Sequence, residues 1–386
     1  MHSHDSRKRN DVPTVDQNWS KRRLNAIMSD HGEYMGMIGR SADRWLIFLL
    51  VWVILLSCVP VIGARQLPVI RISVENTPAH VQTRAVQRYA DLLAERLEGR
   101  YDVQFYQAAS LFRDVDIFRA LTQGKVEIAV PGTWQFDRYV PEVGLFLLPS
   151  LYGRDPSVTY ALMESAVGAQ IVSAIERVMD VQVLGRWIDL GHTHIFSTHR
   201  AIRSRDDFAG KRIRVAGGVG NVLRVNAMGA TALTIAWPDF ASALRRNTVD
   251  GVLTSYETIA SARLWEAGIN AVYEDRQYFA QYVPIVSRQF WERIPQDVRD
   301  ILTDSWEGLV DQARREAAVS QVHSRSDMLR QGVTITMVSD DYIRRTRDLL
   351  MPQEPQMALE MGIPSDIYTQ FSAFIRRNSM AQVHTR

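Results

Sequence analysis

Arg214 is the residue whose type and setting best suit ligand chemistry. It lies in the strand-like segment Arg212–Val215, which runs into a glycine-rich stretch that contains Gly217. A guanidinium group binds a carboxylate through two parallel hydrogen bonds, which a lysine ammonium cannot form. The glycines allow close approach of the backbone to a ligand, and the first amides of a following helix attract anions. A carboxylate site is one interpretation; a surface arginine paired with Asp206 or Asp207 is the other, and spacing alone leaves both open.

Patterns typical of catalysis are weak in this chain. It has neither a Gly-x-Ser-x-Gly nucleophile elbow nor a His-Glu-x-x-His metal motif, and its single cysteine, Cys58, lies in an apolar leader. The glycine-rich stretch lacks the last glycine of a dinucleotide fingerprint. His192 and His194 would share a strand face, but the sequence offers them no evident carboxylate or cysteine partner. We predict a binding protein and not an enzyme, with no cofactor and no metal.

Composition and charge agree with a large folded body. The chain has 386 residues, of which 46% are hydrophobic, enough to bury a large core in two lobes or domains. Its formal net charge of +2 is small for this length, and its aromatic residues are not interleaved with basic ones. Nucleic acid is therefore not expected as a partner.

The N-terminal part of the chain has the pattern of a leader. Residues 45–64 are almost continuously apolar and flanked by arginines, which indicates a signal peptide or a membrane anchor. Three fates stay open: cleavage after Ala64, retention as an anchor in the inner membrane, or lipid attachment at Cys58. Residues 1–44 are polar and of mixed charge, so we expect disorder, and a start codon later than the first methionine stays open.

Hydrophobic periodicity indicates strands that alternate with helices. Strand-like segments at 69–74 and 126–130 enclose a helical pattern over 81–97, and strand character resumes at 194–197. Such alternation predicts an α/β fold, with a largely parallel sheet in the first lobe. In such sheets ligands bind at the carboxyl ends of the strands, so a cleft between two lobes would suit capture by closure.

Lobe boundaries follow from the same pattern. We place lobe I at 67–190 together with about 280–319, and lobe II at 191–279 together with about 320–386. The segment 296–330 is strongly helical, because its apolar residues are spaced for burial on one side.

Several short motifs carry a family resemblance that covers nearly everything after the leader. Together with the segment around Arg214, they are similar to those of TRAP transporter substrate-binding proteins of the DctP family. The motifs are Asn76–His80, Gln107–Leu111, Leu147–Leu151, Gly229–Thr231, Trp237–Asp239 and Val249–Gly251.

The resemblance implies a two-lobed, periplasmic-binding-protein-like fold with a ligand cleft between the lobes and a long helix that spans the hinge. It implies a periplasmic protein that captures a small organic acid by lobe closure and delivers it to integral-membrane TRAP subunits driven by an ion gradient. A monomer is expected, with a dimer as the alternative. A membrane-tethered ligand sensor built on the same fold is the alternative function, which a retained leader would favour.

The resemblance also assigns residues. Arg214 matches the arginine that binds the substrate carboxylate, and Trp237 matches an aromatic residue that packs on the ligand. Thr254 stands where many relatives have asparagine. His194 stands where a second basic residue is usual, which favours a monocarboxylate or pH-sensitive binding, with a neutral histidine in the pocket wall as the alternative. Asp239 stands where glutamate is usual and is expected to support Arg214.

Further candidates come from the first lobe. We add Asn76 and Trp134, because the loops after two strands of lobe I should end at the same cleft. Gly217 is expected to let the backbone approach the ligand. The alternative for Trp134 and Trp237 is that both are core residues, as most large aromatic rings are.

Overall fold

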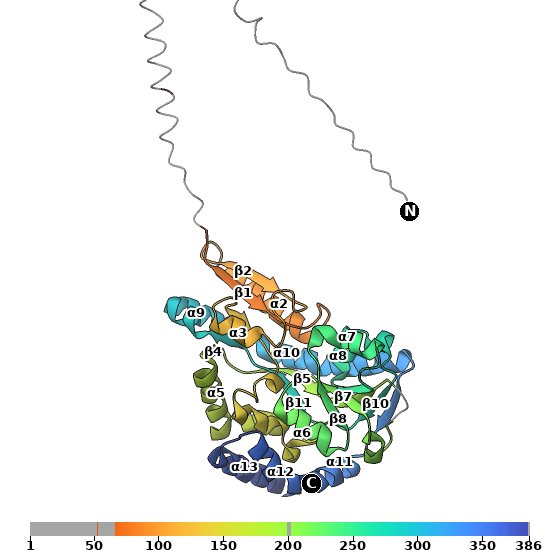
Figure 1. Ribbon diagram of the computed structural model, residues 1–386. Helices are drawn as coiled ribbons and strands as arrows, with labels where there is room; N and C mark the ends of the chain where they lie inside the picture. The colour runs from red at the N-terminus through yellow and green to blue at the C-terminus, as the bar shows by residue number, and fades with distance from the viewer. Residues whose placement is uncertain (1–51, 53–65, 199–201, 385–386) are drawn as a thin grey trace, which may run out of the picture. The chain divides into compact units, whose positions relative to one another are not determined.

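The computed structural model describes residue 52, residues 66–198 and residues 202–384 (Figure 1). The chain divides into two units, Met1–Gln66 and Leu67–Arg386, and the fold is that of the second unit. The predictions for residues 1–44, for the fate of the leader and for Cys58 lie outside the described residues.

Within residues 66–198 and 202–384, no single helix is long and apolar enough to cross a membrane. The bent pair α4 (Pro156–Met163) and α5 (Ala166–Met179) is long and apolar enough, judged by length and composition alone. Each of these two helices buries one face in the protein, since Leu162 and Ile171 are fully buried while other residues of the pair are exposed.

One sheet has five strands in the order β2-β1-β3-β12-β4. Strand β1 pairs in parallel with β2 and β3, whereas β12 runs antiparallel to β3 and β4. Ile70 and Ile72 on β1 are fully buried because alternate residues of a strand face the same side. The strands are Val69–Ser73 (β1), Asp102–Tyr106 (β2), Ile128–Ala129 (β3), Val181–Val183 (β4) and Ile285–Ser287 (β12).

Helix α2 (Val81–Arg96) packs on this sheet beside β2 and β1 (Figure 1). Its buried face carries Ala85, Tyr89 and Leu93, four residues apart, as the helical periodicity predicts. His80 begins the helix, because its Nδ1 accepts a hydrogen bond of 3.1 Å from the backbone N–H of Gln82.

A second sheet has six strands in the order β13-β10-β6-β9-β7-β8. Strand β7 pairs in parallel with β8 and β9, while β6 runs antiparallel to β9 and β10. The two sheets together give the predicted α/β fold, but the five-stranded sheet is mixed and not largely parallel as predicted, because β12 returns to it late in the chain and runs antiparallel to both of its neighbours. The strands are His194–Ser197 (β6), Arg212–Val215 (β7), Thr231–Thr234 (β8), Gly251–Thr254 (β9), Ala271–Glu274 (β10) and Thr334–Met337 (β13).

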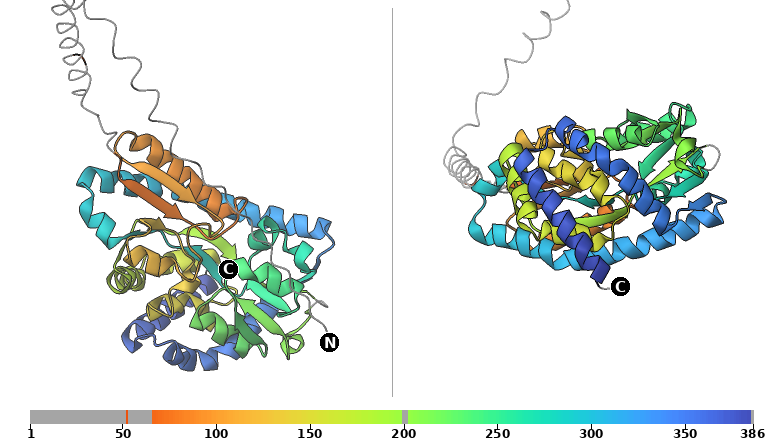
Figure 2. Two further views of the ribbon diagram at one scale, coloured as in Figure 1. Left: turned by 45° about the horizontal axis from the view of Figure 1, so that its top comes forward. Right: turned by 90° about the horizontal axis from the view of Figure 1, so that it is seen from below.

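The chain passes between the two sheets through a separate antiparallel pair, β5 (Ile188–His192) and β11 (Phe279–Tyr282). The long helix α10 (Gln296–Arg330) packs against β5, against α2, and against α8 (Tyr256–Ser261), which follows β9. It therefore contacts a helix that packs on the five-stranded sheet and a helix that follows a strand of the six-stranded sheet, and Figure 2 shows it in light blue along the base of the right-hand view. This is the helix predicted over 296–330.

The buried stripe of α10 explains how it holds its position. Val298, Leu302 and Trp306 recur every four residues and are fully buried. The Trp306 ring meets Tyr89 of α2 edge-on at 5.3 Å, and its Nε1 donates a 2.9 Å hydrogen bond to the carbonyl oxygen of Arg186. One aromatic side chain thus joins the helix to α2 and to the chain that enters β5.

The C-terminal helices pack on the segment between β3 and β4. Helix α13 (Ser365–His384) contacts α5 and the 3-10 helix η2 (Pro141–Leu147), which belong to the part of the chain placed in lobe I. Strand β13 in contrast joins the six-stranded sheet. The residues assigned to lobe II after 320 are therefore shared between two neighbourhoods, and the lobe boundaries stay a prediction.

The remaining helices connect these elements. The α-helices are Ile117–Thr122 (α3), Val219–Ala227 (α6), Trp237–Arg245 (α7), Arg288–Arg293 (α9), Asp340–Leu350 (α11) and Glu354–Glu360 (α12). The other 3-10 helices are Thr133–Gln135 (η1), Pro149–Leu151 (η3), Arg205–Phe208 (η4), Leu264–Ala267 (η5) and Met351–Gln353 (η6).

Candidate functional site

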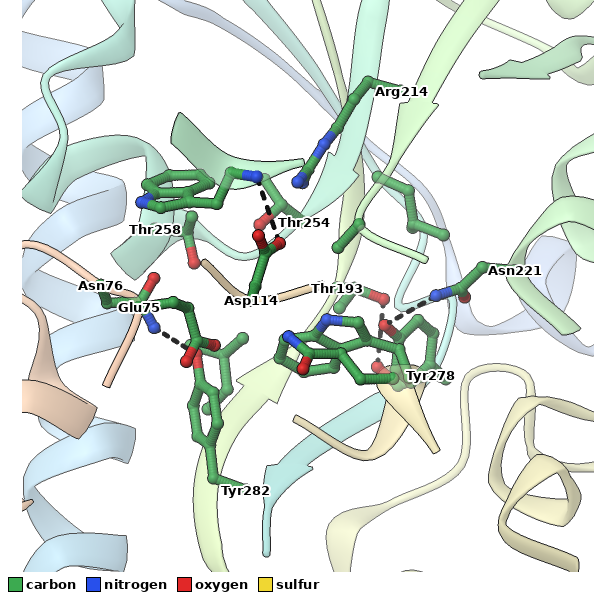
Figure 3. A pocket seen from close by; sticks show the side chains of 16 residues that line it. Glu75, Asn76, Asp114, Thr193, Arg214, Asn221, Thr254, Thr258, Tyr278 and Tyr282 are labelled. Atoms are coloured by element: carbon green, nitrogen blue, oxygen red, sulfur yellow. Dashed lines mark hydrogen bonds between the residues drawn. The ribbon is translucent and has the colours of Figure 1, made fainter. Parts of the chain in front are cut away.

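A pocket lies where loops from the two sheets meet (Figure 3). Asn76 follows β1, Trp134 lies in η1 after β3, and Ala216 follows β7, so the carboxyl ends of strands from both sheets contribute to its wall. The space between the lining atoms, open mouth included, is about 470 Å³.

Arg214 is held inside the wall of this pocket by β7 and α7. Its side chain is 2% exposed, and its guanidinium carbon lies 5.8 Å from the ring centre of Trp237 and 4.9 Å from that of Phe240. Nε donates a 2.9 Å hydrogen bond to the carbonyl oxygen of Ile235, which fixes the plane of the group. Nη2 has no hydrogen-bond partner among the described residues.

The charge of Arg214 survives its burial. Loss of water lowers the pKa of the guanidinium from 12.5 to about 10, and the nearby Asp114 opposes that change. Arg214 is therefore cationic at neutral pH, desolvated and oriented, with an N–H group free for an acceptor. Such a group binds an anion more strongly than a surface arginine does, because the low dielectric strengthens the interaction. The alternative of a surface arginine paired with Asp206 or Asp207 does not match this burial.

Four other predicted residues line the same pocket: Asn76, Trp134, Trp237 and Thr254. The amide of Asn76 donates to Gln82 Oε1 at 2.7 Å and to the Tyr282 hydroxyl at 3.0 Å, so it orders the wall. Trp134 Nε1 is buried without a hydrogen-bond partner in the described structure. The strand-end argument pointed to Asn76 and Trp134 and the family resemblance to Trp237 and Thr254, and the structure brings all four to one pocket.

Gly217 and Gly218 contact another segment of the protein, whereas Gly217 was predicted to let the backbone approach the ligand. Gly217 does not line the pocket, and a Cβ there would lie 3.8 Å from the carbonyl oxygen of Trp134. At Gly218, where φ is +85°, a Cβ would lie only 2.6 Å from that oxygen and 2.9 Å from Asp137 Oδ1. The glycines thus allow close approach between two segments of the protein, the loop after β7 and the η1 region.

His194 lies outside the pocket wall, contrary to the expectation that it would contact the ligand. Its Nδ1 accepts a 3.0 Å hydrogen bond from the backbone N–H of Arg276, and its ring packs on Tyr256 at 5.2 Å. Burial, with smaller effects of nearby cationic groups, holds its pKa well below the usual value, so the ring is neutral. The preceding residue, Thr193, lines the pocket instead, because neighbouring residues of an extended chain face opposite sides.

Asp239 does not support Arg214 either. Its exposed carboxylate forms an ion pair with Arg113 at the surface. The carboxylate beside Arg214 is Asp114, which is 4% exposed and lines the pocket. Its Oδ2 accepts a 3.1 Å hydrogen bond from the backbone N–H of Trp237, while its Oδ1 has no partner within the described ranges.

Sequence reasoning missed most of the polar residues of the wall, among them Glu75, Asp114 and Asn221. Burial raises the pKa of Glu75 from 4.5 to about 8, with a smaller contribution from Asp114, so this carboxyl is protonated at neutral pH. Its position directly before Asn76, at the end of β1, was a usable signal. Asp114 lies in an irregular loop and Asn221 inside a helix, so neither strand ends nor motifs pointed to them.

Asp137 joins the two sides of the pocket behind these residues. Its Oδ2 accepts a 2.8 Å hydrogen bond from the backbone N–H of Gly220 at the start of α6. Burial raises the pKa of Asp137 to about 6, although hydrogen bonds from backbone amides oppose that rise. No group of three or more His, Cys, Asp or Glu side chains suited to a metal ion occurs in the described parts of the chain.

Comparisons with known proteins show which proteins this chain is similar to. The C4-dicarboxylate-binding periplasmic protein DctP of Shewanella loihica is 26% identical over 237 residues, which are 60% of this chain and 66% of that protein. The DctP protein of Rhodobacter capsulatus is 24% identical over 296 residues, which are 76% of this chain and 87% of that protein. The chain thus spans about two thirds or more of these relatives.

Solved structures have the same fold. A TRAP periplasmic solute-binding protein from Ralstonia eutropha, crystallised with (S)-2-acetolactate, matches with a TM-score of 0.73 and 25% identity, covering 80% of this chain and 99% of that one. The model of the bacterial extracellular solute-binding proteins, family 7, matches residues 72–359, which is most of the chain. The chain therefore belongs to this family, the DctP family of TRAP periplasmic solute-binding proteins that its motifs resemble.

Proposed function

We propose that this protein captures a small organic acid in the pocket between its two sheets, through Arg214, and delivers it to the membrane subunits of a TRAP transporter. The observation that carries the proposal is the unpartnered Nη2 of the buried Arg214, which faces a pocket built from both sheets. A buried cation with an unsatisfied N–H group costs free energy, and an anionic or polar ligand that pairs with the group reduces this cost.

Family membership sets the wider context. The family consists of periplasmic binding proteins of transport systems, so the predictions of a transport function and of the absence of catalysis are confirmed. The relatives named above are described as binding C4-dicarboxylates or contain a 2-hydroxy acid, and a small carboxylate for this chain follows by analogy. We propose a monomer as the binding unit, as the family resemblance implies.

A thermal-shift experiment tests the proposal. The full chain in mild detergent is heated with each member of a panel of mono- and dicarboxylates, since a ligand that binds only the folded state raises the melting temperature. We expect a shift with at least one acid, lost in Arg214→Ala and kept in Arg245→Ala. Arg245 is a matched control, because it is exposed on α7, the helix that also carries Trp237. Shifts that survive in Arg214→Ala would overturn the assignment.

A further inference from the structure

The charges around the pocket are unequal. Among the described residues that line the pocket, Arg214 is the only cationic side chain; Asp114 is a carboxylate, while the carboxyl of Glu75 is protonated at neutral pH. One carboxylate of a ligand can therefore pair with a guanidinium, but a second carboxylate would meet no cation and would approach Asp114. Placing like charges together in a desolvated site is costly, so the wall disfavours a plain dicarboxylate.

The unpartnered atoms of the wall point to donors on the ligand. Asp114 Oδ1 is buried without a hydrogen-bond partner in the part of the chain that the structure describes. A carboxylate oxygen only accepts hydrogen bonds, so its complement is an O–H or N–H group. Figure 3 shows the Asp114 carboxylate and the Arg214 guanidinium pointing into the same part of the pocket. No hydrogen bond between them is present, and the backbone of Trp237 holds the other oxygen of Asp114.

A second acceptor lies farther along the wall. Asn221 is 1% exposed, and its Nδ2 donates a 3.2 Å hydrogen bond to the carbonyl oxygen of Gly217, which defines the orientation of the amide. Its Oδ1 is consequently an acceptor, and it too has no partner among the described residues. Acceptors that lack partners are costly when buried, and a ligand with donors satisfies them.

We propose that the ligand is a monocarboxylate with a hydrogen-bond donor, a hydroxyl or an ammonium group, on the carbon next to its carboxylate. Arg214 holds the carboxylate, and Asp114 accepts the hydrogen bond from the neighbouring donor. Asn221 accepts from a further donor where the ligand has one. This inference rests on the proposed function, since it assumes that Arg214 binds the acid.

Titration calorimetry on the full chain in mild detergent tests the inference with ligands matched in carbon number. The four probes are butanoate, 2-hydroxybutanoate, 2-aminobutanoate and succinate. We expect at least one of the substituted monocarboxylates to bind at least tenfold more tightly than butanoate and succinate. The hydroxy and amino arms show whether the donor is a hydroxyl or an ammonium group. Equal affinity for butanoate, or a preference for succinate, would overturn the inference and leave the proposed function standing.

The variant Asp114→Asn makes the test specific to the donor. The asparagine can still accept from the N–H of Trp237 but turns an N–H₂ group towards the position of Oδ1. We expect the affinity for the substituted acid to fall at least tenfold, while the affinity for succinate stays unchanged or rises because a negative charge is gone. Asp304→Asn, on the exposed side of α10, is the control and should change neither.

Each outcome of the variant experiment has one meaning. A loss of affinity for all four probes together with a lowered melting temperature would indicate a folding defect, and the comparison of the four probes on the wild-type protein then decides the inference. Parallel changes for the substituted acid and for succinate in a folded Asp114→Asn variant would refute the assigned role of Asp114. No binding of any carboxylate to the wild-type protein would refute the proposed function itself.

Discussion

Glu75→Gln should change how the stability of this protein depends on pH. Burial raises the pKa of the Glu75 carboxyl from 4.5 to about 8. The folded protein therefore keeps a proton on this group between those two pH values, while the unfolded chain loses it. The stability that this group contributes is fully present below pH 4.5 and is lost as the pH rises through 8. At 1.36 kcal/mol for each pKa unit, the loss amounts to about 5 kcal/mol in all.

Glutamine has nearly the same shape as protonated glutamic acid but does not ionise. The unfolding free energy of Glu75→Gln minus that of the wild type should therefore increase by up to ~1.4 kcal/mol for each pH unit between 4.5 and 8. Urea denaturation at pH 5, 6, 7 and 8 measures this difference, and Glu98→Gln, an exposed carboxyl at the end of α2, provides the control. A difference that stays constant across this range would show that Glu75 is not protonated in the folded protein, and the reasoning would fail.

Three further predictions concern binding and stability. Arg214→Lys keeps the charge but loses the fork and its hydrogen bond to Ile235, so calorimetry should show at least a tenfold loss of affinity for the best acid; unchanged affinity would contradict bidentate binding. Gly218→Ala should lower the unfolding free energy by about 1–3 kcal/mol more than Gly210→Ala, since both have positive φ but only Gly218 has a carbonyl 2.6 Å from the new Cβ; equal effects in urea melts would argue against the clash. Trp306→Ala should cost about 3–5 kcal/mol in the same assay, because the ring is fully buried; a cost below about 1 kcal/mol would rule out its anchoring role.

Residues near the carboxyl ends of strands could be assigned to the pocket where apolar and polar residues alternate regularly along the sequence. Arg214 lies on a strand whose core neighbours Ile213 and Val215 point the other way, so its side chain had to face the opposite side near the carboxyl end of the sheet. The same reasoning placed Asn76 and Trp134 at the pocket. The apolar stripe of α10 was predictable because burial on one side of a helix leaves a period of about four residues in the sequence.

His194 and Asp239 show where such reasoning ends. A shift of one residue along an extended chain changes the side that a residue faces, so Thr193 reached the pocket and His194 did not. Asp239 lies only 25 positions after Arg214 in the sequence, yet its carboxylate is at the surface beside Arg113, and the buried Asp114 lies 100 positions before Arg214. Loops without a periodic pattern carry no signal of which wall they will join.

The sequence by itself determined the α/β class, the long helix and the family, and it singled out Arg214 as the candidate for anion binding, because each depends on local periodicity or on a short motif. Only the tertiary structure decided which polar groups share the pocket with Arg214, since Glu75, Asp114 and Asn221 come together through packing of distant segments. It also decided the protonation of Glu75, because burial and a neighbouring carboxyl set a pKa, and neither is written in local sequence.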